Sequence, residues 1–423
     1  MLASSGEAPV HPALNFELPA VSTAIVDRKQ HCRAYPSSAS SLNLSNTRTV
    51  RIRLGGEDFV DPNSIRLMYT LKNDASAATT YLKPTTGPWG VWQQCYLRSG
   101  GQELDNIPYY NRWHSQYGFN QLTREEQFGS VGVEGWHMSE RDAAGTFRPD
   151  RAHIPGGSSI TVMHRLHFSL FSAGKLLPVK FAPLEIEMSL CNETSDWADA
   201  SSGSSQAYTI SDVQLLYNAI TLDEAVQNSL YSALLANKVL SVGTMGCYQI
   251  CHPIPAGSAS YSFSSVRAFS RLAQIWLTFR GTGPRASQFI CPGDLPGNAD
   301  VTSNELNNKA VPTARLSIGA HTWPGQQPAA SAAEYYFMMI SALGTQPNIT
   351  RRDFEHDCFT IVWDLCKTPG NAQNSISTRS GDLVRVELNG LAAGASGAAT
   401  ECWMTLVNYQ IVAVRESGVT LLT

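Results

Sequence analysis

Apolar and polar residues alternate along much of this chain of 423 residues. The segments 50–54, 65–71, 160–170 and 184–190 each place apolar side chains at every second position. Side chains of a β-strand point alternately to opposite faces, so this period predicts strands with one buried face. Clusters of Gly, Pro, Ser and Asn separate the segments, which is typical of an antiparallel sandwich or barrel.

Three segments interrupt this alternation and predict helices. Residues 224–236 carry an apolar stripe at helical spacing behind Asp223, which is a suitable N-cap. Residues 332–343 follow Ser331, and a glutamate three residues after that serine completes a capping box. A third helix is expected between residues 108 and 128. The helices are short and few, so the chain is expected to be mainly β.

The order of the predicted elements repeats. Each half opens with alternating strands, passes a turn into a helix and returns to long strands. The first half ends in the strand-like run 212–223, and the second half ends in the run 403–415. A chain of this length suggests two or three domains. We therefore expect a duplicated architecture with its boundary between residues 223 and 257.

Composition and charge exclude several classes of protein. The net charge is −4, and residues 1–38 contain three basic and three acidic side chains. A protein that wraps nucleic acid directly carries a block of Lys and Arg instead. We find no apolar run long enough for a membrane span and no signal-peptide pattern at residues 1–19. The nine cysteines lie mostly in apolar runs, which indicates buried thiols in a reducing compartment.

The sequence gives only weak signals of a catalytic or metal site. His164 and His167 fall on opposite faces of one predicted strand, so they are not expected to share an ion, and His164 is expected in the core. Cys247, Cys251 and His252 lack a second ligand pair at structural-zinc spacing. We therefore expect no catalytic residue, no metal and no cofactor.

Five aromatic residues between positions 89 and 113 are candidates for anchors at subunit interfaces, where Trp and Tyr contribute much of the binding energy. They are Trp89, Trp92, Tyr109, Tyr110 and Trp113. The alternative is that each is an ordinary core aromatic.

Three segments in a fixed order resemble the double jelly-roll major capsid proteins. Residues 166–191 are similar to a strand pair of the family's first jelly roll, where a Phe-rich segment, a lysine and Leu-Pro precede an alternating strand. Residues 315–344 and 359–390 resemble parts of the second jelly roll. Within the adenovirus-like lineage of icosahedral DNA viruses, the resemblance points to the capsid proteins of polinton-like viruses and virophages.

This resemblance implies an all-β fold of two tandem eight-stranded antiparallel jelly rolls with a few short helices. We expect an extended arm over residues 1–38, a first jelly roll over 39–223, a connecting helix and linker over 224–257, and a second jelly roll over 258–423.

The resemblance also implies a structural protein and not an enzyme. Homotrimers with a pseudo-hexagonal outline would tile an icosahedral shell around a DNA genome, so the protein would belong to the virion. The expected partners are further copies of the chain, penton proteins and minor capsid proteins, without sequence-specific nucleic acid. The resemblance does not decide whether an internal membrane is present. Two alternative functions stay open: a jelly-roll carbohydrate-binding module and a two-cupin metal enzyme.

Overall fold

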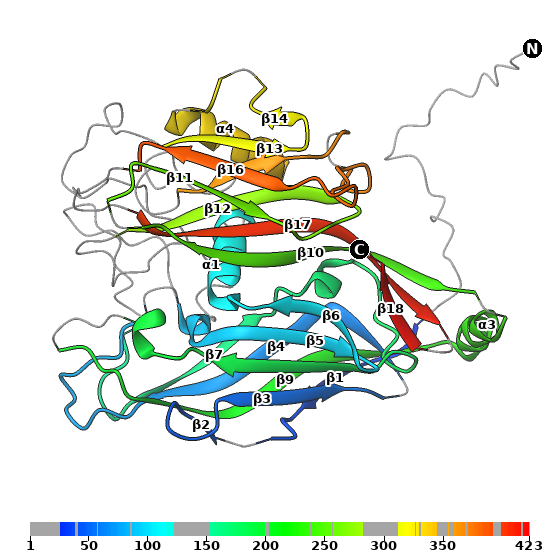
Figure 1. Ribbon diagram of the computed structural model, residues 1–423. Coiled ribbons are helices and arrows are strands. Elements are labelled where there is room, and N and C mark those ends of the chain that lie inside the picture. The colour runs from blue at the N-terminus through cyan, green and yellow to red at the C-terminus, as the bar shows by residue number, and fades with distance from the viewer. Residues whose placement is uncertain are drawn as a thin grey trace, which may run out of the picture.

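The computed structural model places two β-sandwiches next to each other in one chain (Figure 1). No helix in the part that it describes has the length and apolar character needed to cross a membrane. The described residues are 26–38, 41–56, 58–84, 87–121, 153–198, 203–236, 238–255, 257–281, 312–325, 327–329, 331–344, 354, 359–368, 371–391, 399–415 and 418–422.

The first sandwich contains two antiparallel sheets. One sheet has the order β1-β9-β4-β7, with the short β2 also pairing β9, and the other has the order β3-β8-β5-β6. The strands are β1 (Val26–Ala34), β2 (Ser41–Leu42), β3 (Thr49–Leu54), β4 (Phe59–Asn73), β5 (Trp92–Ser99), β6 (Gln102–Ile107), β7 (Ser159–Arg165), β8 (Leu184–Leu190) and β9 (Tyr208–Leu222).

The second sandwich repeats this plan. Its sheets have the orders β10-β17-β12-β15, with β18 also pairing β17, and β11-β16-β13-β14. The strands are β10 (Leu240–Pro253), β11 (Ser260–Ser265), β12 (Leu272–Gly281), β13 (Thr313–Ile318), β14 (His321–Trp323), β15 (Ile361–Asp364), β16 (Val384–Asn389), β17 (Ala399–Arg415) and β18 (Gly418–Leu422).

The duplication is visible in the strand orders. Counted along each half without β2 and β18, both halves pair their strands in the orders 1-8-3-6 and 2-7-4-5. Two four-stranded sheets connected in this way form a jelly roll. The described part of the chain therefore contains two jelly rolls in tandem, and the predicted fold class is confirmed.

Alternation along the strands builds each core. In β8 the apolar side chains at every second position are buried, and the glutamates between them face outward. Glu187 accepts hydrogen bonds from Arg51 of β3 at 2.8 Å and from Arg98 of β5 at 2.9 Å. The inner face of this sheet is thus held by apolar burial, and charged pairs link its neighbouring strands on the outer face.

The helices form where the sequence predicts them. In α3 (Glu224–Leu235), Asp223 caps the first turn by accepting from the Ala225 N–H. In α4 (Ala332–Leu343), Ser331 accepts from the Glu334 N–H, and Gly344 ends the helix in the left-handed region with a φ of 68°. The third helix, α1, spans Tyr110–Gln121.

The structure corrects the predicted limits of the arm. Residues 26–34, which we assigned to an extended arm, form β1 and pair with β9 along its second half. The alternation is missing here because most side chains of β1 are exposed on both faces of the strand. A strand without a buried face leaves no apolar period in the sequence.

The start of the second jelly roll also differs from the prediction. Residues 240–253 were expected in a linker, but they form β10, the first strand of that jelly roll. Two features conceal this strand. Its interior contains Gly243 and Gly246, and the polar residues Thr244 and Gln249 are buried in it. The connection between the jelly rolls is therefore α3 and the few residues that follow it.

The two glycines of β10 make room for side chains of β17. A Cβ atom on Gly243 would lie 2.0 Å from the Tyr409 hydroxyl, and one on Gly246 would lie 2.5 Å from the Gln410 Oε1 atom. Gln410 is buried, and its Nε2 donates to Ser169 Oγ of the first jelly roll at 3.1 Å. Gly246 thus leaves room for Gln410 to reach the first jelly roll, whereas Tyr409 over Gly243 accepts from Gln373 of its own jelly roll.

We expect Gly246→Ala to lower the stability of the protein because the added methyl group displaces the Gln410 amide. In a Gln410→Ala background the same change should cost much less. The coupling between the two substitutions should be of the order of 1–3 kcal/mol. Urea unfolding of the wild type, the two single variants and the double variant measures it. Strictly additive effects would show that the glycine serves another purpose.

Candidate functional site: the junction between the jelly rolls

Helix α1 lies between the two jelly rolls (Figure 1) and carries Tyr110 and Trp113, two of the five aromatic residues that the sequence singles out. Tyr109, just before the helix, packs edge-on against Trp403 of β17 with ring centroids 4.4 Å apart. The guanidinium of Arg112 lies 5.2 Å from the centre of the same Trp403 ring. The Tyr109 N–H also donates to Gln249 Oε1 of β10. This end of α1 therefore binds the second jelly roll through stacking, charge and a hydrogen bond.

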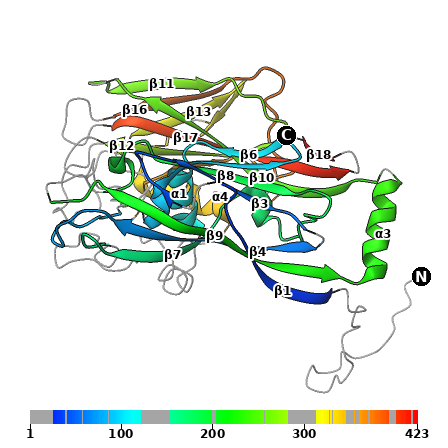
Figure 2. The ribbon, with the colours of Figure 1, turned by 90° about the horizontal axis from the view of Figure 1, so that it is seen from below.

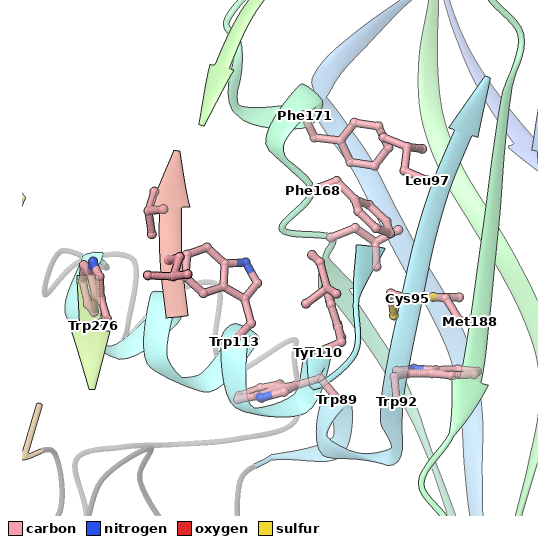
Figure 3. Packing of buried hydrophobic residues seen from close by; sticks show 14 of the residues in the cluster. Trp89, Trp92, Cys95, Leu97, Tyr110, Trp113, Phe168, Phe171, Met188 and Trp276 are labelled. Atoms are coloured by element: carbon pink, nitrogen blue, oxygen red, sulfur yellow. The ribbon is translucent and has the colours of Figure 1, made fainter. Parts of the chain in front are cut away.

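Four of the five predicted interface anchors lie in the interior of the chain (Figure 3). Trp92 and Tyr110 are fully buried, and Trp89 and Trp113 are 3% and 6% exposed. Side chains with so little free surface contribute to the core of their own chain in this conformation, which was the alternative to the anchor assignment. Tyr109 is half-buried, and its role as an anchor at a subunit interface stays a prediction.

Each of these aromatics has a specific neighbour. Trp92 packs edge-on against Tyr69, and Trp89 stacks on His114 with ring centroids 4.7 Å apart. The Trp113 indole N–H donates to the His167 carbonyl at 3.2 Å. Trp113 also lines a cavity of about 380 Å³ that β10 and β17 close from the other side. Helix α1 thus connects the core of the first jelly roll with the junction.

Asp105 of β6 is at the centre of a set of buried hydrogen bonds that crosses the junction. Its carboxylate accepts from the Ser169 N–H at 2.8 Å and from the Ser169 hydroxyl at 2.6 Å. It also accepts from the amide of Gln410, at 3.4 Å. Ser169 begins the short 3-10 helix η3 (Ser169–Ser172) of the first jelly roll, and Gln410 belongs to the second. All three side chains are buried, so each hydrogen bond offsets part of the cost of removing a polar group from water.

Burial raises the pKa of Asp105 from 3.8 to about 6, although the hydrogen bonds from Ser169 and Gln410 act in the opposite direction. Between pH 3.8 and about 6, the folded protein therefore holds a proton on this carboxyl that the unfolded chain has already released. Sequence reasoning did not find this group because its partners lie 64 and 305 residues away along the chain.

Three histidines meet beside α1. The ring of His114 lies 5.2 Å from that of His164 and 4.4 Å from that of His167. We expected His164 and His167 in one strand, but β7 ends at Arg165, so His167 lies beyond the strand. The described residues nevertheless include no group of three ligand-type side chains with metal-binding geometry.

The histidine cluster is uncharged at neutral pH. Burial lowers the pKa of His164 to about 4, although its hydrogen bond to the Arg165 carbonyl acts in the opposite direction. Burial and the nearby charge of Arg165 lower the pKa of His167 to about 3. Burial and the other two imidazoles lower the pKa of His114 well below 6.5. His164 Nδ1 donates to the Arg165 carbonyl, and its Nε2 is buried with no partner within the described part of the chain. His164 is therefore a core histidine with one of its two nitrogens satisfied.

The buried cysteines offer no activated nucleophile. Cys247, which lines the cavity, has a thiol whose pKa burial raises well above 9.0, and the same holds for Cys95 and Cys402. A nucleophilic cysteine needs the opposite shift. The seven cysteines in the described part of the chain are all free thiols. The junction thus has the chemistry of a structural contact.

The raised pKa of Asp105 predicts a stability that falls as pH rises. A carboxyl that stays protonated in the folded state contributes most below pH 3.8, and this contribution is lost as pH rises through about 6. Between pH 4 and pH 7, we expect the free energy of unfolding of the wild type to fall by roughly 2–3 kcal/mol relative to that of Asp105→Asn. Urea unfolding at several pH values measures the difference, with exposed Asp382→Asn as the control. A difference that does not change with pH would contradict this assignment.

The lowered pKa values of the histidines predict the opposite dependence. The buried neutral His167 contributes most above pH 6.5, and its contribution is lost as pH falls toward about 3. The free energy of unfolding of His167→Gln should therefore fall less steeply with decreasing pH than that of the wild type. The difference should be up to about 1.4 kcal/mol per pH unit below 6.5. The backbone bonds of His167 to Tyr110 and Trp113 remain in this variant. Exposed His31→Gln, the matched control, should unfold with the pH dependence of wild type.

Comparison with known proteins identifies the fold. No family model matches the sequence, and no curated protein matches it. Solved structures do match. VP54 of PBCV-1 aligns with a TM-score of 0.64 and 13% identity over 96% of this chain and 98% of its own. A chain of the Sputnik virophage aligns with a TM-score of 0.63 and 12% identity over 100% of this chain and 93% of its own.

The mavirus major capsid protein also aligns, with a TM-score of 0.54 and 9% identity over 100% of this chain and 95% of its own. At these identities the likeness concerns the arrangement of the chain in space and not its individual residues. The match extends over nearly the whole of each protein and includes both jelly rolls. The chain therefore has the double jelly-roll fold of these viral major capsid proteins.

Proposed function

We propose that this protein is a major capsid protein, whose homotrimers with a pseudo-hexagonal outline tile an icosahedral virus shell. One observation carries the proposal. The chain contains the same eight-stranded unit twice, in the same strand order, with little beyond the connecting helix between the two units. Three such chains around a threefold axis present six similar lobes, and a six-lobed unit can tile a hexagonal lattice.

The junction supports this role. A capsid subunit must hold its two lobes in a fixed relation, or the six lobes of a trimer would not form a regular outline. Asp105 and Gln410 link the lobes through buried hydrogen bonds, and Tyr109 and Arg112 pack on Trp403. The apolar core is also continuous across the two jelly rolls. A contact of this kind makes the two lobes move as one body.

The role that we propose is structural and not catalytic. The buried thiols and imidazoles have pKa values displaced away from reactivity, since burial keeps the thiols protonated and the imidazoles uncharged. Penton and minor capsid proteins would complete the shell around the genome, and the protein would reside in the virion. These partners follow from the proposed function.

Light scattering tests the proposal. We expect a particle with three times the 46.0 kDa of the chain, stable on dilution because obligate interfaces of roughly 2,000–5,000 Å² dissociate slowly. Negative-stain images should show a hexagonal outline with threefold symmetry. A monomer or dimer that binds sugar would favour the carbohydrate-binding alternative. Stoichiometric bound metal, lost on His164→Ala, would favour the two-cupin alternative.

A further inference from the structure

The end of the molecule at α3 exposes apolar side chains together with lysines. Helix α3 stands out from the body at this end (Figure 2). It is attached through Val226 and Leu230, which pack on a small cluster of Phe59, Ile220 and Leu222. Its outer side is left uncovered, with Tyr231 53% and Leu235 48% exposed. The helix therefore buries one stripe and presents a second apolar stripe to the outside.

Neighbouring loops extend this surface. Phe181 stacks on Tyr231 with ring centroids 6.4 Å apart, and Lys175 Nζ donates to the Ser241 carbonyl at the start of β10. These contacts bring the loop 174–181 next to the helix and the strand. We define the α3 patch by its apolar and basic members. The apolar members are Leu176, Tyr231, Leu235 and Val239, and the basic members are Lys175, Lys180 and Lys238, all exposed.

The first described residue of the chain lies beside this patch. Val26 pairs with Leu222, the last residue of β9, and Asp223 then caps α3. Residues 1–25 thus join the fold at the N-terminal end of α3. Twenty-five residues can extend to roughly 80 Å, whereas α3 is only about 18 Å long. The segment is long enough to cover the whole patch from its point of attachment.

The composition of residues 1–25 complements the patch. The segment contains Glu7 and Glu17 and no lysine or arginine. Around Glu17 it reads Leu14-Asn15-Phe16-Glu17-Leu18, with apolar side chains at every second position. An extended segment of this pattern places three apolar side chains on one face, against the patch, and Glu17 on the opposite face, where the long side chains of lysines at the rim can reach its carboxylate.

We propose that the α3 patch is the docking surface for residues 1–25 of the same chain, with Phe16 against Tyr231 and Leu235 and with Glu17 toward the lysines. Attachment at Val26 gives the segment a high effective concentration at this surface, which a segment from another chain lacks. Docking would cover an apolar surface that is otherwise open to water. The inference does not depend on the trimer, because the patch and the segment belong to one chain.

Photo-crosslinking of the full-length protein tests this proposal. A benzoylphenylalanine in place of Phe16 should crosslink to the segments 174–181 and 224–239, as mapped by mass spectrometry. The product should run as a single chain on a denaturing gel. Crosslinks that map elsewhere, or a product with the mass of two chains, would overturn the proposal. Light scattering on the same sample reports the oligomer separately.

Two variants and a control sharpen the test. Leu235→Ser should lower the crosslinking yield by about fivefold, since about half of a leucine's burial is lost. Glu17→Lys should also lower it, because the charge then repels the lysines of the patch. Phe337→Ser on α4, where the side chain is 69% exposed, should leave the yield unchanged. An unchanged yield in Leu235→Ser would show that the patch does not receive the segment.

Discussion

The arrangement of this molecule depends on buried polar groups that find partners only when the two jelly rolls are joined. Apolar burial can form each jelly roll by itself, but it is tolerant of small displacements between the two. Hydrogen bonds are directional, and a buried donor or acceptor without a partner costs about 1–3 kcal/mol. Asp105 and Ser169 of the first jelly roll bind each other at the junction, and the buried Gln410 of the second jelly roll donates to both. A shift of one jelly roll against the other would leave the Gln410 amide without these partners.

The same constraint explains unusual features of β10 and β17. These strands face the first jelly roll, so they carry Gln249 and Gln410, which bond to Tyr109 and Ser169, where a strand of an isolated sandwich would be apolar. The glycines of β10 then become necessary, because long polar side chains from β17 pass over them. The sequence of the second jelly roll is thus adapted to its neighbour as well as to its own core.

This adaptation also limits what the sequence reveals. The period of two predicts strands such as β8, where one face meets the core and the other meets water, and the capping residues predict α3 and α4. The period disappears in β1, where most side chains are exposed, and in β10, where the buried positions are partly polar. Pairings across 305 residues, such as Asp105 with Gln410, leave no local pattern at all.

The two jelly rolls share a topology but not a surface. In both, a helix follows the fifth strand and precedes the sixth: α1 in the first half and α4 in the second. Helix α1 lies between the halves and supplies Tyr110 and Trp113 to the core. Helix α4 exposes Phe337 on one side, while Gln274 of β12 donates to its Ala342 carbonyl on the other. Because equivalent helices perform different tasks, the six lobes of a trimer would alternate between two kinds. The outline would then approach a hexagon while the symmetry remains threefold.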